Sequence, residues 1–429
     1  MNRKPSLLVV FLTVFIDLVG FGIVVPLVPI FSRHYGASGF VIGAIIASFS
    51  AMQFIFSPIW GRLSDRHGRR PILLISTAGA ALSYVLFAIG SGFENHTAAL
   101  WALLVSRMAA GICGGNITVA QAYIADITPP ENRSKRMGLI GMAFGLGFIF
   151  GPAISGIALH FFGSTGPGWA AAGLCAANFV LAFCILAESL KSDSGHAAQR
   201  PHFAQWGHTL AQPKIGLLIL IFFLATFAFS CFESTLPLLV SDNFNLGIVL
   251  DETKPATTVI SLFVFCGLIG AFIQGGAIGR LVKMFGEPKL IALSLFLTGI
   301  SLILLPYIKG DGQLKWLAVL RASDWQWIKM LLALALLSIG SGLTRPPLFG
   351  LLSNLTPANE QGATIGVAQS AGALARIVGP LFAAILYLRI APFPYVFCGG
   401  LSILAALLTW QFLCRKDSAP AAVPGIQPQ

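Results

Sequence analysis

Five charged side chains stand inside long apolar stretches of the sequence. They are Asp17, Arg107, Glu233, Arg345 and Arg376. A charge at the centre of a bilayer costs at least about 2.5 kcal/mol on insertion scales, so such a residue marks a candidate functional site. Acids and arginines in one interior can hold a proton, an ion or a charged substrate.

Asp17 lies about eleven residues into the first apolar segment, which at about 1.5 Å per residue is near the middle of a membrane. The side chain can be a neutral acid or a carboxylate, so it is a candidate proton carrier. Arg107, in the fourth segment, is its candidate partner. The alternative is a structural acid paired permanently to Arg107 or Arg376. Asn116 points to another face and is expected to bond to a neighbouring helix.

The charged residues of the second half allow several interpretations of their role. Glu233 could contact a cationic substrate, carry a proton or extend toward the outer surface. One interpretation of Arg345 is that it simply anchors its helix at the inner interface. Arg376 is the stronger candidate for a cavity residue. One face of the fourth segment carries polar and small side chains, as expected of a cavity lining or a close helix contact. The predicted substrate cavity comprises Gln53, Gly111, Thr118, Gln121, Gln369 and Arg376.

Composition identifies the class of protein. The chain has 429 residues, of which 56% are hydrophobic and 10% charged, against roughly 25% charged in a soluble protein. About twelve apolar segments are long enough to span a bilayer. The seven cysteines show no pairing or metal-ligand spacing, and no cleavable signal peptide is recognised. The predicted fold is an all-α integral membrane protein of two pseudo-symmetric six-helix bundles.

The net charge of +11 is carried by short loops, which argues against a nucleic-acid partner. With the N-terminus in the cytoplasm, 17 Lys and Arg residues fall on the inner side and 7 on the outer side. This asymmetry predicts cytoplasmic N- and C-termini.

Hydropathy sets the expected spans and domains. The spans are 6–31, 39–60, 72–90, 98–123, 137–161, 169–187, 215–240, 257–278, 290–308, 328–352, 362–388 and 395–414. The predicted domains are an N-terminal bundle over 1–188, a cytoplasmic linker over 189–213, a C-terminal bundle over 214–414 and a disordered cytoplasmic tail over 415–429.

A short basic stretch, Gly61–Pro71, joins the second and third spans. Its arginines suit the anionic inner surface, and Asp65 is its one acid. Glycines permit a sharp reversal, so the stretch predicts a tight turn with Pro71 at the first position of the next helix. A degenerate copy, Gly279–Gly286, has Lys283 in place of the acid. A pattern that recurs at half the chain length indicates a duplicated architecture.

Several motifs resemble the major facilitator superfamily of transporters. The basic stretch is similar to its signature loop, Gly-x-Leu-x-Asp-Arg-x-Gly-Arg-Arg. The run Asp17–Gly22, followed by Pro26 and Pro29, looks like the first helix of tetracycline efflux proteins and related drug:proton antiporters. Arg107-x-x-x-Gly111 looks like the fourth-helix motif. The fifth-helix antiporter motif is matched by Gly147, Gly151, Pro152 and Gly156, and departs from it at Ser155.

The resemblance implies a cytoplasmic gate between the halves. Asp65 would face the positive N-terminal end of the eleventh helix, near Gly362, where a carboxylate is favoured. Arg69 would pair with Asp126 after the fourth helix. The implied gate residues are Gly61, Asp65, Arg66, Gly68, Arg69 and Asp126.

These patterns favour proton-coupled export of a small amphipathic, drug-like molecule by alternating access, with Asp17, Arg107 and Glu233 in proton coupling. The alternative is proton-linked uptake of a small metabolite, anionic if Arg107 and Arg376 bind it. The sequence contains no nucleophile–base pair or phosphate loop that would support a membrane enzyme. Its paired repeats with asymmetric buried charges favour alternating access over a channel. We expect no metal or cofactor, a proton gradient as energy source, lipid and substrate as partners, a functional monomer, and a bacterial inner membrane location.

Overall fold

The computed structural model describes residues 5–190, 202–246, 254–316, 319, 324–356 and 361–414. All regular secondary structure within these ranges is helical. Eleven helical segments are long and apolar enough to cross a membrane. The expected eighth span is a shorter apolar helix, Thr257–Phe272. The predicted tail, 415–429, and residues 191–201 of the predicted linker lie outside the described residues.

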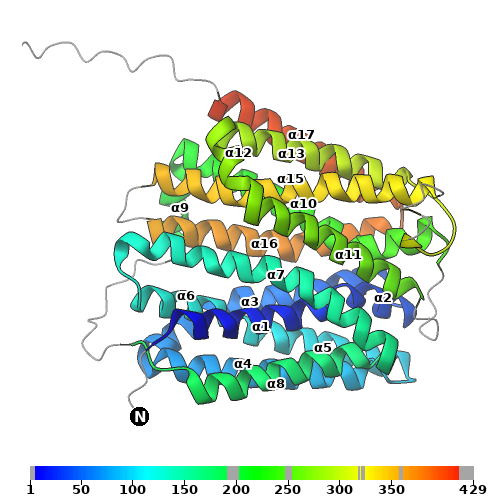
Figure 1. Ribbon diagram of the computed structural model, residues 1–429, viewed down its shortest axis with the longest axis horizontal. Coiled ribbons are helices and arrows are strands. Elements are labelled where there is room, and N and C mark those ends of the chain that lie inside the picture. The colour runs from blue at the N-terminus through cyan, green and yellow to red at the C-terminus, as the bar shows by residue number, and fades with distance from the viewer. Residues whose placement is uncertain are drawn as a thin grey trace, which may run out of the picture.

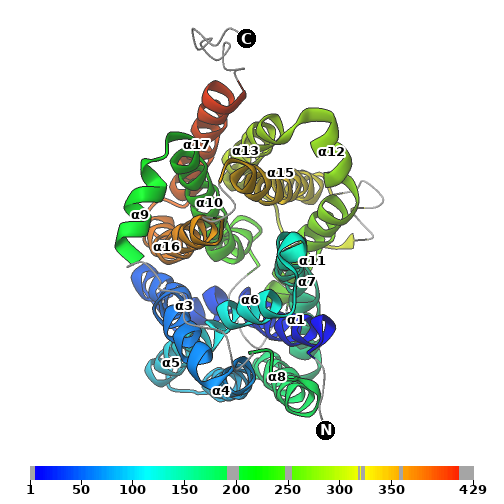
Figure 2. The same ribbon diagram turned by 90° about the vertical axis from the view of Figure 1, so that its left-hand side faces the viewer.

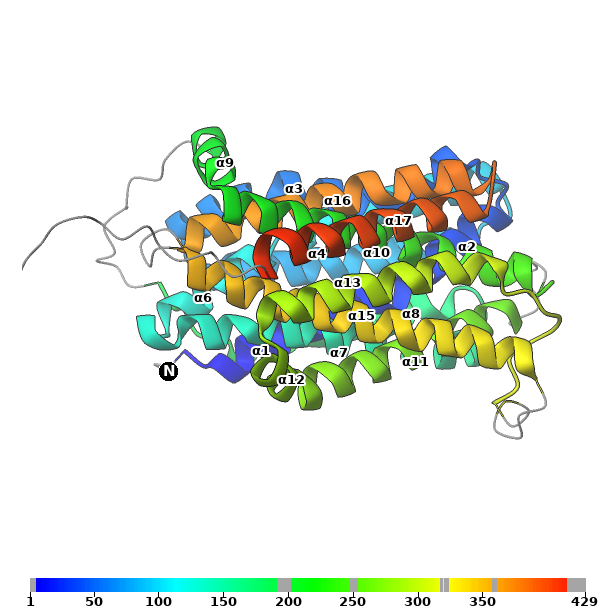
Figure 3. The same ribbon diagram turned by 90° about the horizontal axis from the view of Figure 1, so that it is seen from above.

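The helices form two side-by-side groups with roughly parallel long axes (Figures 1 and 3). The first group is α1 (Leu7–Val24), α2 (Leu27–His34), α3 (Gly39–His67), α4 (Arg69–Gly90), α5 (His96–Gly114), α6 (Ile117–Asp126), α7 (Pro130–Phe162) and α8 (Gly166–Ile185). The second is α10 (Pro213–Asn243), α11 (Lys254–Phe272), η1 (Ile273–Ala277), α12 (Ile278–Phe285), α13 (Glu287–Leu304), η2 (Leu305–Tyr307), α15 (Trp325–Leu355), α16 (Gln361–Tyr387), α17 (Pro392–Thr409) and η3 (Trp410–Cys414).

A further short helix, α9 (His202–Ala211), lies within the predicted linker and leads into α10. The end-on view shows both groups in cross-section (Figure 2). They meet mainly along two helix pairs, α3 with α16 and α7 with α11, and α2 also contacts α10.

Three expected spans are interrupted helices. The first divides into α1 and α2 beside Pro26, and Pro29 removes a further backbone donor. The fourth divides into α5 and α6 at residues 115 and 116. The eighth passes through a π-helical turn, η1, before α12. Irregular backbone at membrane depth is tolerated only where protein or water satisfies its polar groups.

The basic stretch is mostly helix, so the prediction of a loop over its whole length is wrong. The helix α3 continues to His67, and Gly68 alone separates it from α4, with a φ of 97°. Glycine adopts this left-handed φ without the penalty of a side chain, so one residue suffices for the reversal. Pro71 is the third residue of α4 rather than the first. Gly286, with a φ of 77°, makes the equivalent turn between α12 and α13.

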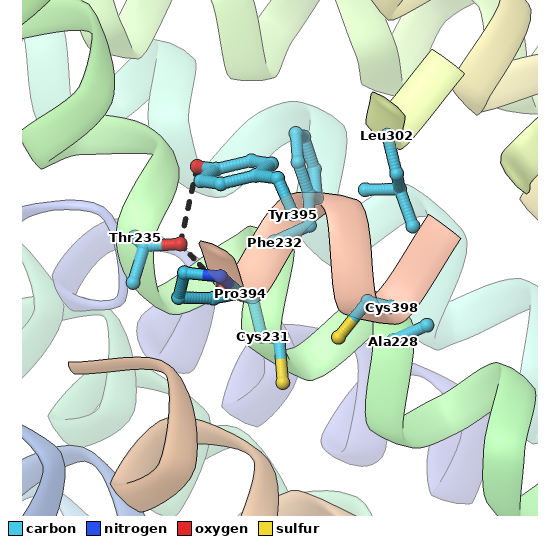
Figure 4. Close-up of a pocket in the computed structure, with 8 residues that line it drawn as sticks. All are labelled: Ala228, Cys231, Phe232, Thr235, Leu302, Pro394, Tyr395 and Cys398. Atoms are coloured by element: carbon cyan, nitrogen blue, oxygen red, sulfur yellow. Dashed lines mark hydrogen bonds between the residues drawn. The ribbon is translucent and has the colours of Figure 1, made fainter. Parts of the chain in front are cut away.

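An apolar seam joins α10 to α17 in the second half (Figure 4). The hydroxyl groups of Thr235 and Tyr395 are 3.1 Å apart there. The gap between the helices is too narrow to admit water. The seam therefore packs the bundle and offers no space to a substrate.

An ion pair joins the two halves at one end of the molecule, which we call the Arg33 end. The Arg33 guanidinium is 2.7 Å from Asp242, and the Tyr387 hydroxyl donates to the same carboxylate at 2.8 Å. Beside it, Gly43 of α3 lies so close to α16 that a Cβ atom would sit 2.8 Å from Leu381 Cα. The halves are therefore held together at this end.

We predict that Arg33→Ala opens the Arg33 end. A partly exposed ion pair contributes at most about 1 kcal/mol, which corresponds to a population shift of up to about fivefold. Spin labels at Glu94 and Lys309, both exposed near this end, should give a longer mean distance in the variant. Arg389→Ala removes an exposed arginine of the same end and should leave the distance unchanged. An unchanged distance in Arg33→Ala would contradict the prediction.

Candidate functional site

Asp17 is held by two amide side chains of its own half. Asn116 Nδ2 donates to Asp17 Oδ2 at 2.8 Å, and Asn178 Nδ2 donates to Asp17 Oδ1 at 2.9 Å. Asn178 also donates to the Thr13 carbonyl at 2.9 Å. Each carboxylate oxygen thus receives one neutral donor.

Arg107 is not the partner of Asp17, which corrects the expectation from the sequence. None of the ion pairs among the described residues includes either side chain. The reason is geometric, because the break after α5 brings Asn116 to the carboxylate while Arg107 stays on α5. The expected bond from Asn116 to a neighbouring helix is present. Asn178 was missed, although an amide in an apolar span is the same kind of signal as a buried charge.

Close helix packing positions Asp17 within the bundle. A Cβ atom on Gly151 of α7 would lie 2.6 Å from Gly22 Cα of α1, and one on Gly147 would lie 2.9 Å from the Leu18 carbonyl. These two glycines therefore let α7 pack closely against the part of α1 that lies C-terminal to Asp17. Gly156, further along α7, faces Ile260 of α11 in the other half, and Pro152 lies inside α7.

Arg107 is 3% exposed and rests on aromatic rings. Its guanidinium carbon is 4.6 Å from the Phe49 ring centroid and 5.3 Å from that of Phe21. Such cation–π contacts stabilise a desolvated cation. Arg107 Nε and Nη1 are nevertheless buried without a hydrogen-bond partner among the described residues. A buried guanidinium with free donors is suited to bind an acceptor that it lacks in this conformation.

The backbone carbonyls at the break between α5 and α6 accept hydrogen bonds from side chains, most of which lie on other helices. Residues 112 to 115 lose regular helical bonding there, because the following amides bond three residues back. Trp60 Nε1 donates to the Ile112 carbonyl at 2.7 Å, and Gln53 Nε2 donates to the Gly114 carbonyl at 2.9 Å. Ser76 bonds the Cys113 carbonyl, and Thr118 bonds the Gly115 carbonyl at 2.8 Å. The break is therefore built into the bundle.

Several predicted cavity residues lie at this break. Gln53 and Thr118 use their polar groups on backbone carbonyls. Gly111 is buried where α5 crosses the backbone of Phe49. Gln121 is half-buried on α6. The lining of a substrate cavity by these residues stays a prediction.

The charges of the second half form a group to which Arg107 of the first half also belongs. Glu233 of α10 interacts electrostatically with Arg376, Arg107 and Arg345. Arg345 of α15 lies 5.5 Å from the Phe222 ring centroid. Glu233 and Arg376 are half-buried, and Gln369 is exposed on α16. The tertiary structure thus brings charges from α5, α10, α15 and α16 into one electrostatic neighbourhood.

The expected ion pair between Arg69 and Asp126 is present. Arg69 Nε donates to Asp126 Oδ2 at 3.1 Å, and Arg69 Nη1 bonds Asp65 and the Ser64 hydroxyl. Arg66 lies in the last turn of α3, and Gly61 lies inside that helix. The contact of Asp65 with the start of α16 stays a prediction.

Glu188 and Arg70 form a clasp that sequence reasoning missed. The Glu188 carboxylate accepts from the Arg69 and Arg70 amides at 2.8 and 3.1 Å, which satisfies the N-terminus of α4. Arg70 in turn donates to the Leu186 and Phe183 carbonyls at the C-terminal end of α8, at 2.8 and 2.9 Å. The sequence offered two signals for this contact, namely an acid just after one span and an arginine at the start of another.

Comparisons with known proteins agree with this architecture. The profile of the Major Facilitator Superfamily matches residues 10–323 and 277–428. The chain is 32% identical over 398 residues to the class E tetracycline resistance protein of Escherichia coli, which covers 90% of this chain and 88% of that protein. It is 27% identical over 426 residues to multidrug resistance protein 2 of Bacillus subtilis, with 98% of each chain covered.

Among solved structures, the human organic anion transporter MFSD10 aligns with a TM-score of 0.67 at 26% identity. The alignment covers 94% of this chain and 98% of that one.

We predict that Gln53→Leu destabilises the break between α5 and α6. The substitution leaves the Gly114 carbonyl without its donor, and an unsatisfied buried acceptor costs about 1–3 kcal/mol. The melting temperature of the purified protein should fall. Gln121→Leu is the matched control, since Gln121 is half-buried on α6 and its side chain makes no hydrogen bond among the described residues. Equal melting temperatures for the two variants would refute the proposed capping role of Gln53.

Proposed function

The chain belongs to the Major Facilitator Superfamily and is a multi-pass membrane transporter, and from this premise we propose that it exports a small amphipathic molecule in exchange for protons. We keep 1–188 and 214–414 as the two moving domains, joined by 189–213. The class E tetracycline resistance protein and multidrug resistance protein 2, among its relatives, support a drug-like substrate.

One observation carries the proton assignment. The Asp17 carboxylate lies within α1 and is bonded by two amides, and no ion pair among the described residues includes it. An arginine partner would hold an acid in its charged form, whereas an amide can donate to a carboxylate or accept from a carboxylic acid. The site therefore tolerates both protonation states, as a proton carrier requires.

The transport cycle follows from exchange at Asp17 and from the contacts between the halves. With the Arg33 end on the outside, the ion pair between Arg33 and Asp242 closes the outward path. Substrate binds from inside as Asp17 loses its proton, the halves rock, and a proton from outside displaces the substrate. Binding proton or substrate at Asp17, but not both, couples the two flows. The network of Asp65, Arg69 and Asp126 belongs to the inner gate in this scheme.

The remaining assignments belong to the same proposal. The protein works as a monomer in a bacterial inner membrane, with both termini in the cytoplasm. The energy source is the proton gradient, and no cofactor takes part. Arg107 and Glu233 assist proton coupling, and the predicted cavity residues contact the substrate.

We predict that Asp17→Asn abolishes substrate-triggered proton movement in proteoliposomes that contain an internal pH dye. The asparagine keeps the shape of the side chain but cannot carry a proton. Tetracycline and a panel of cationic dyes serve as probes. Glu94→Gln, which removes an exposed acid, should retain the proton flux. Proton flux that persists in Asp17→Asn would exclude this residue as the carrier.

A second candidate function is proton-linked uptake of a small organic anion. The arginines around Glu233 outnumber its single carboxylate, and two buried nitrogen atoms of Arg107 have no acceptor among the described residues. Protonation of Glu233 would leave the positive charges uncompensated and so favour an anion. Proton and anion would then bind together and move in the same direction. The name of human MFSD10, an organic anion transporter, supports testing this alternative.

For this alternative we predict that Arg376→Gln weakens the binding of organic anions about tenfold or more, since a hydrogen bond to a charged group contributes about 1.5–3 kcal/mol. Uptake of labelled mono- and dicarboxylates into proteoliposomes provides the measurement. Protons should enter with the anion, the opposite sign to antiport. Arg389→Gln is the control. Anion uptake that is insensitive to Arg376→Gln would refute an arginine site.

A further inference from the structure

We propose that Asn116 detects the protonation of Asp17 and transmits it to the break between α5 and α6. The inference rests on the proposed role of Asp17 as a proton carrier. It assigns a positioning role to a residue that neither the family resemblance nor the comparisons single out. It follows from an asymmetry between the two amides that bond the carboxylate.

Asn178 is the fixed member of the pair. Its Nδ2 donates to the Thr13 carbonyl and to Asp17 Oδ1, both at 2.9 Å, so both amide hydrogens are used. The residue is 0% exposed, and its Oδ1 is buried without a partner in the described part of the chain. Reversing this amide would place its oxygen against the Thr13 carbonyl oxygen. Asn178 therefore stays a donor, and Asp17 Oδ1 stays an acceptor.

Asn116 is the adaptable member. The one hydrogen bond described for its side chain runs from Nδ2 to Asp17 Oδ2 at 2.8 Å. A half-turn of the amide would present Asn116 Oδ1 to the same carboxylate oxygen. A proton arriving on Asp17 Oδ2 can then be donated to Asn116 Oδ1. One N–H···O bond is replaced by one O–H···O bond, and no covalent bond changes apart from the new O–H.

Other ionisable groups near Asp17 do not compete for this role. Tyr84 of α4, Cys113 of α5 and Cys175 of α8 interact with Asp17 electrostatically. Arg107, the nearby cation, acts on Tyr84. None of these four bonds the carboxylate among the described hydrogen bonds, and α7 presents glycines to this part of α1.

The position of Asn116 connects the amide to the backbone of the break. The backbone N–H of Asn116 donates to the Cys113 carbonyl at 3.1 Å, and the backbone carbonyl of Asn116 accepts from the Ala120 N–H at 2.9 Å, where α6 begins. The preceding carbonyls are held from outside by Trp60, Gln53 and Ser76. A reorientation of Asn116 therefore acts where α6 meets a segment anchored to α3 and α4. Trp60, bonded to Ile112 at 2.7 Å, is a natural reporter.

Two spectroscopic signals measured on the full-length protein without substrate test the inference. The infrared carbonyl band of protonated Asp17, identified by its loss in Asp17→Asn, reports proton binding. The fluorine resonance of 5-fluorotryptophan at position 60, identified by its loss in Trp60→Phe, reports the break. In the wild type both signals should change with the same pH midpoint, and in Asp17→Asn the Trp60 resonance should not respond.

The decisive variant is Asn116→Leu, with Asn116→Ala as a smaller replacement if the leucine variant does not fold. We expect the Asp17 band to keep titrating while the Trp60 resonance loses its pH response. Asn116→Gln, which restores an amide, should recover the response, and Asn178→Leu should retain it.

A Trp60 resonance that follows pH in both Asn116→Leu and Asn116→Ala would overturn the inference and leave the antiport proposal intact. An Asp17 band that never titrates would overturn both. Loss of the response in Asn178→Leu but not in Asn116→Leu would reverse the roles of the two amides and so contradict the inference.

Discussion

Backbone polar groups inside a lipid-facing bundle need hydrogen-bond partners within the protein, and this requirement organises the first half of the molecule. The fourth span is broken, and its freed carbonyls receive donors from Trp60, Gln53 and Ser76. The same break brings Asn116 to the half-buried carboxylate of Asp17. The candidate proton site and the break are thus consequences of one arrangement of hydrogen bonds, because hydrocarbon offers no alternative donor.

The two halves share a plan but treat charge differently. In the first half the acid is bonded by neutral amides, and Arg107 is stabilised by aromatic rings. In the second half Glu233 lies in the field of several arginines. An acid among amides can change its charge with modest rearrangement, whereas an acid among arginines serves as their counter-ion. A division of labour between proton binding and substrate binding is consistent with this difference.

The contacts at the two ends of the molecule also differ in kind. At the Arg33 end, an ion pair to Asp242 crosses between the halves. At the opposite end, the described ion pairs of Arg69 stay within the first half. A molecule that alternates between two closures needs contacts that can be exchanged, and partly exposed ion pairs are weak enough to break. The close glycine contacts of α3 and α7 keep the helices packed.

Much of the fold was predictable from the sequence. Apolar length sets the spans, and the repeated basic stretches mark the duplicated turn that Gly68 and Gly286 make with a positive φ. The ion pair of Arg69 with Asp126 followed from the family resemblance. Buried charges are visible in a sequence because insertion into lipid makes them costly wherever they point. Their partners are not visible in the same way.

Only the tertiary structure decided which groups meet. Arg107 and Asn116 stand on the same span, and the break between α5 and α6 brings the amide, rather than the guanidinium, to Asp17. Helical periodicity cannot place side chains across such a break, because it assumes a continuous helix. Asn178 reaches the same carboxylate through the packing of α8 on α1. The sequence by itself determined that an acid lies within an apolar span at position 17, and the packing of separate helices determined what it binds.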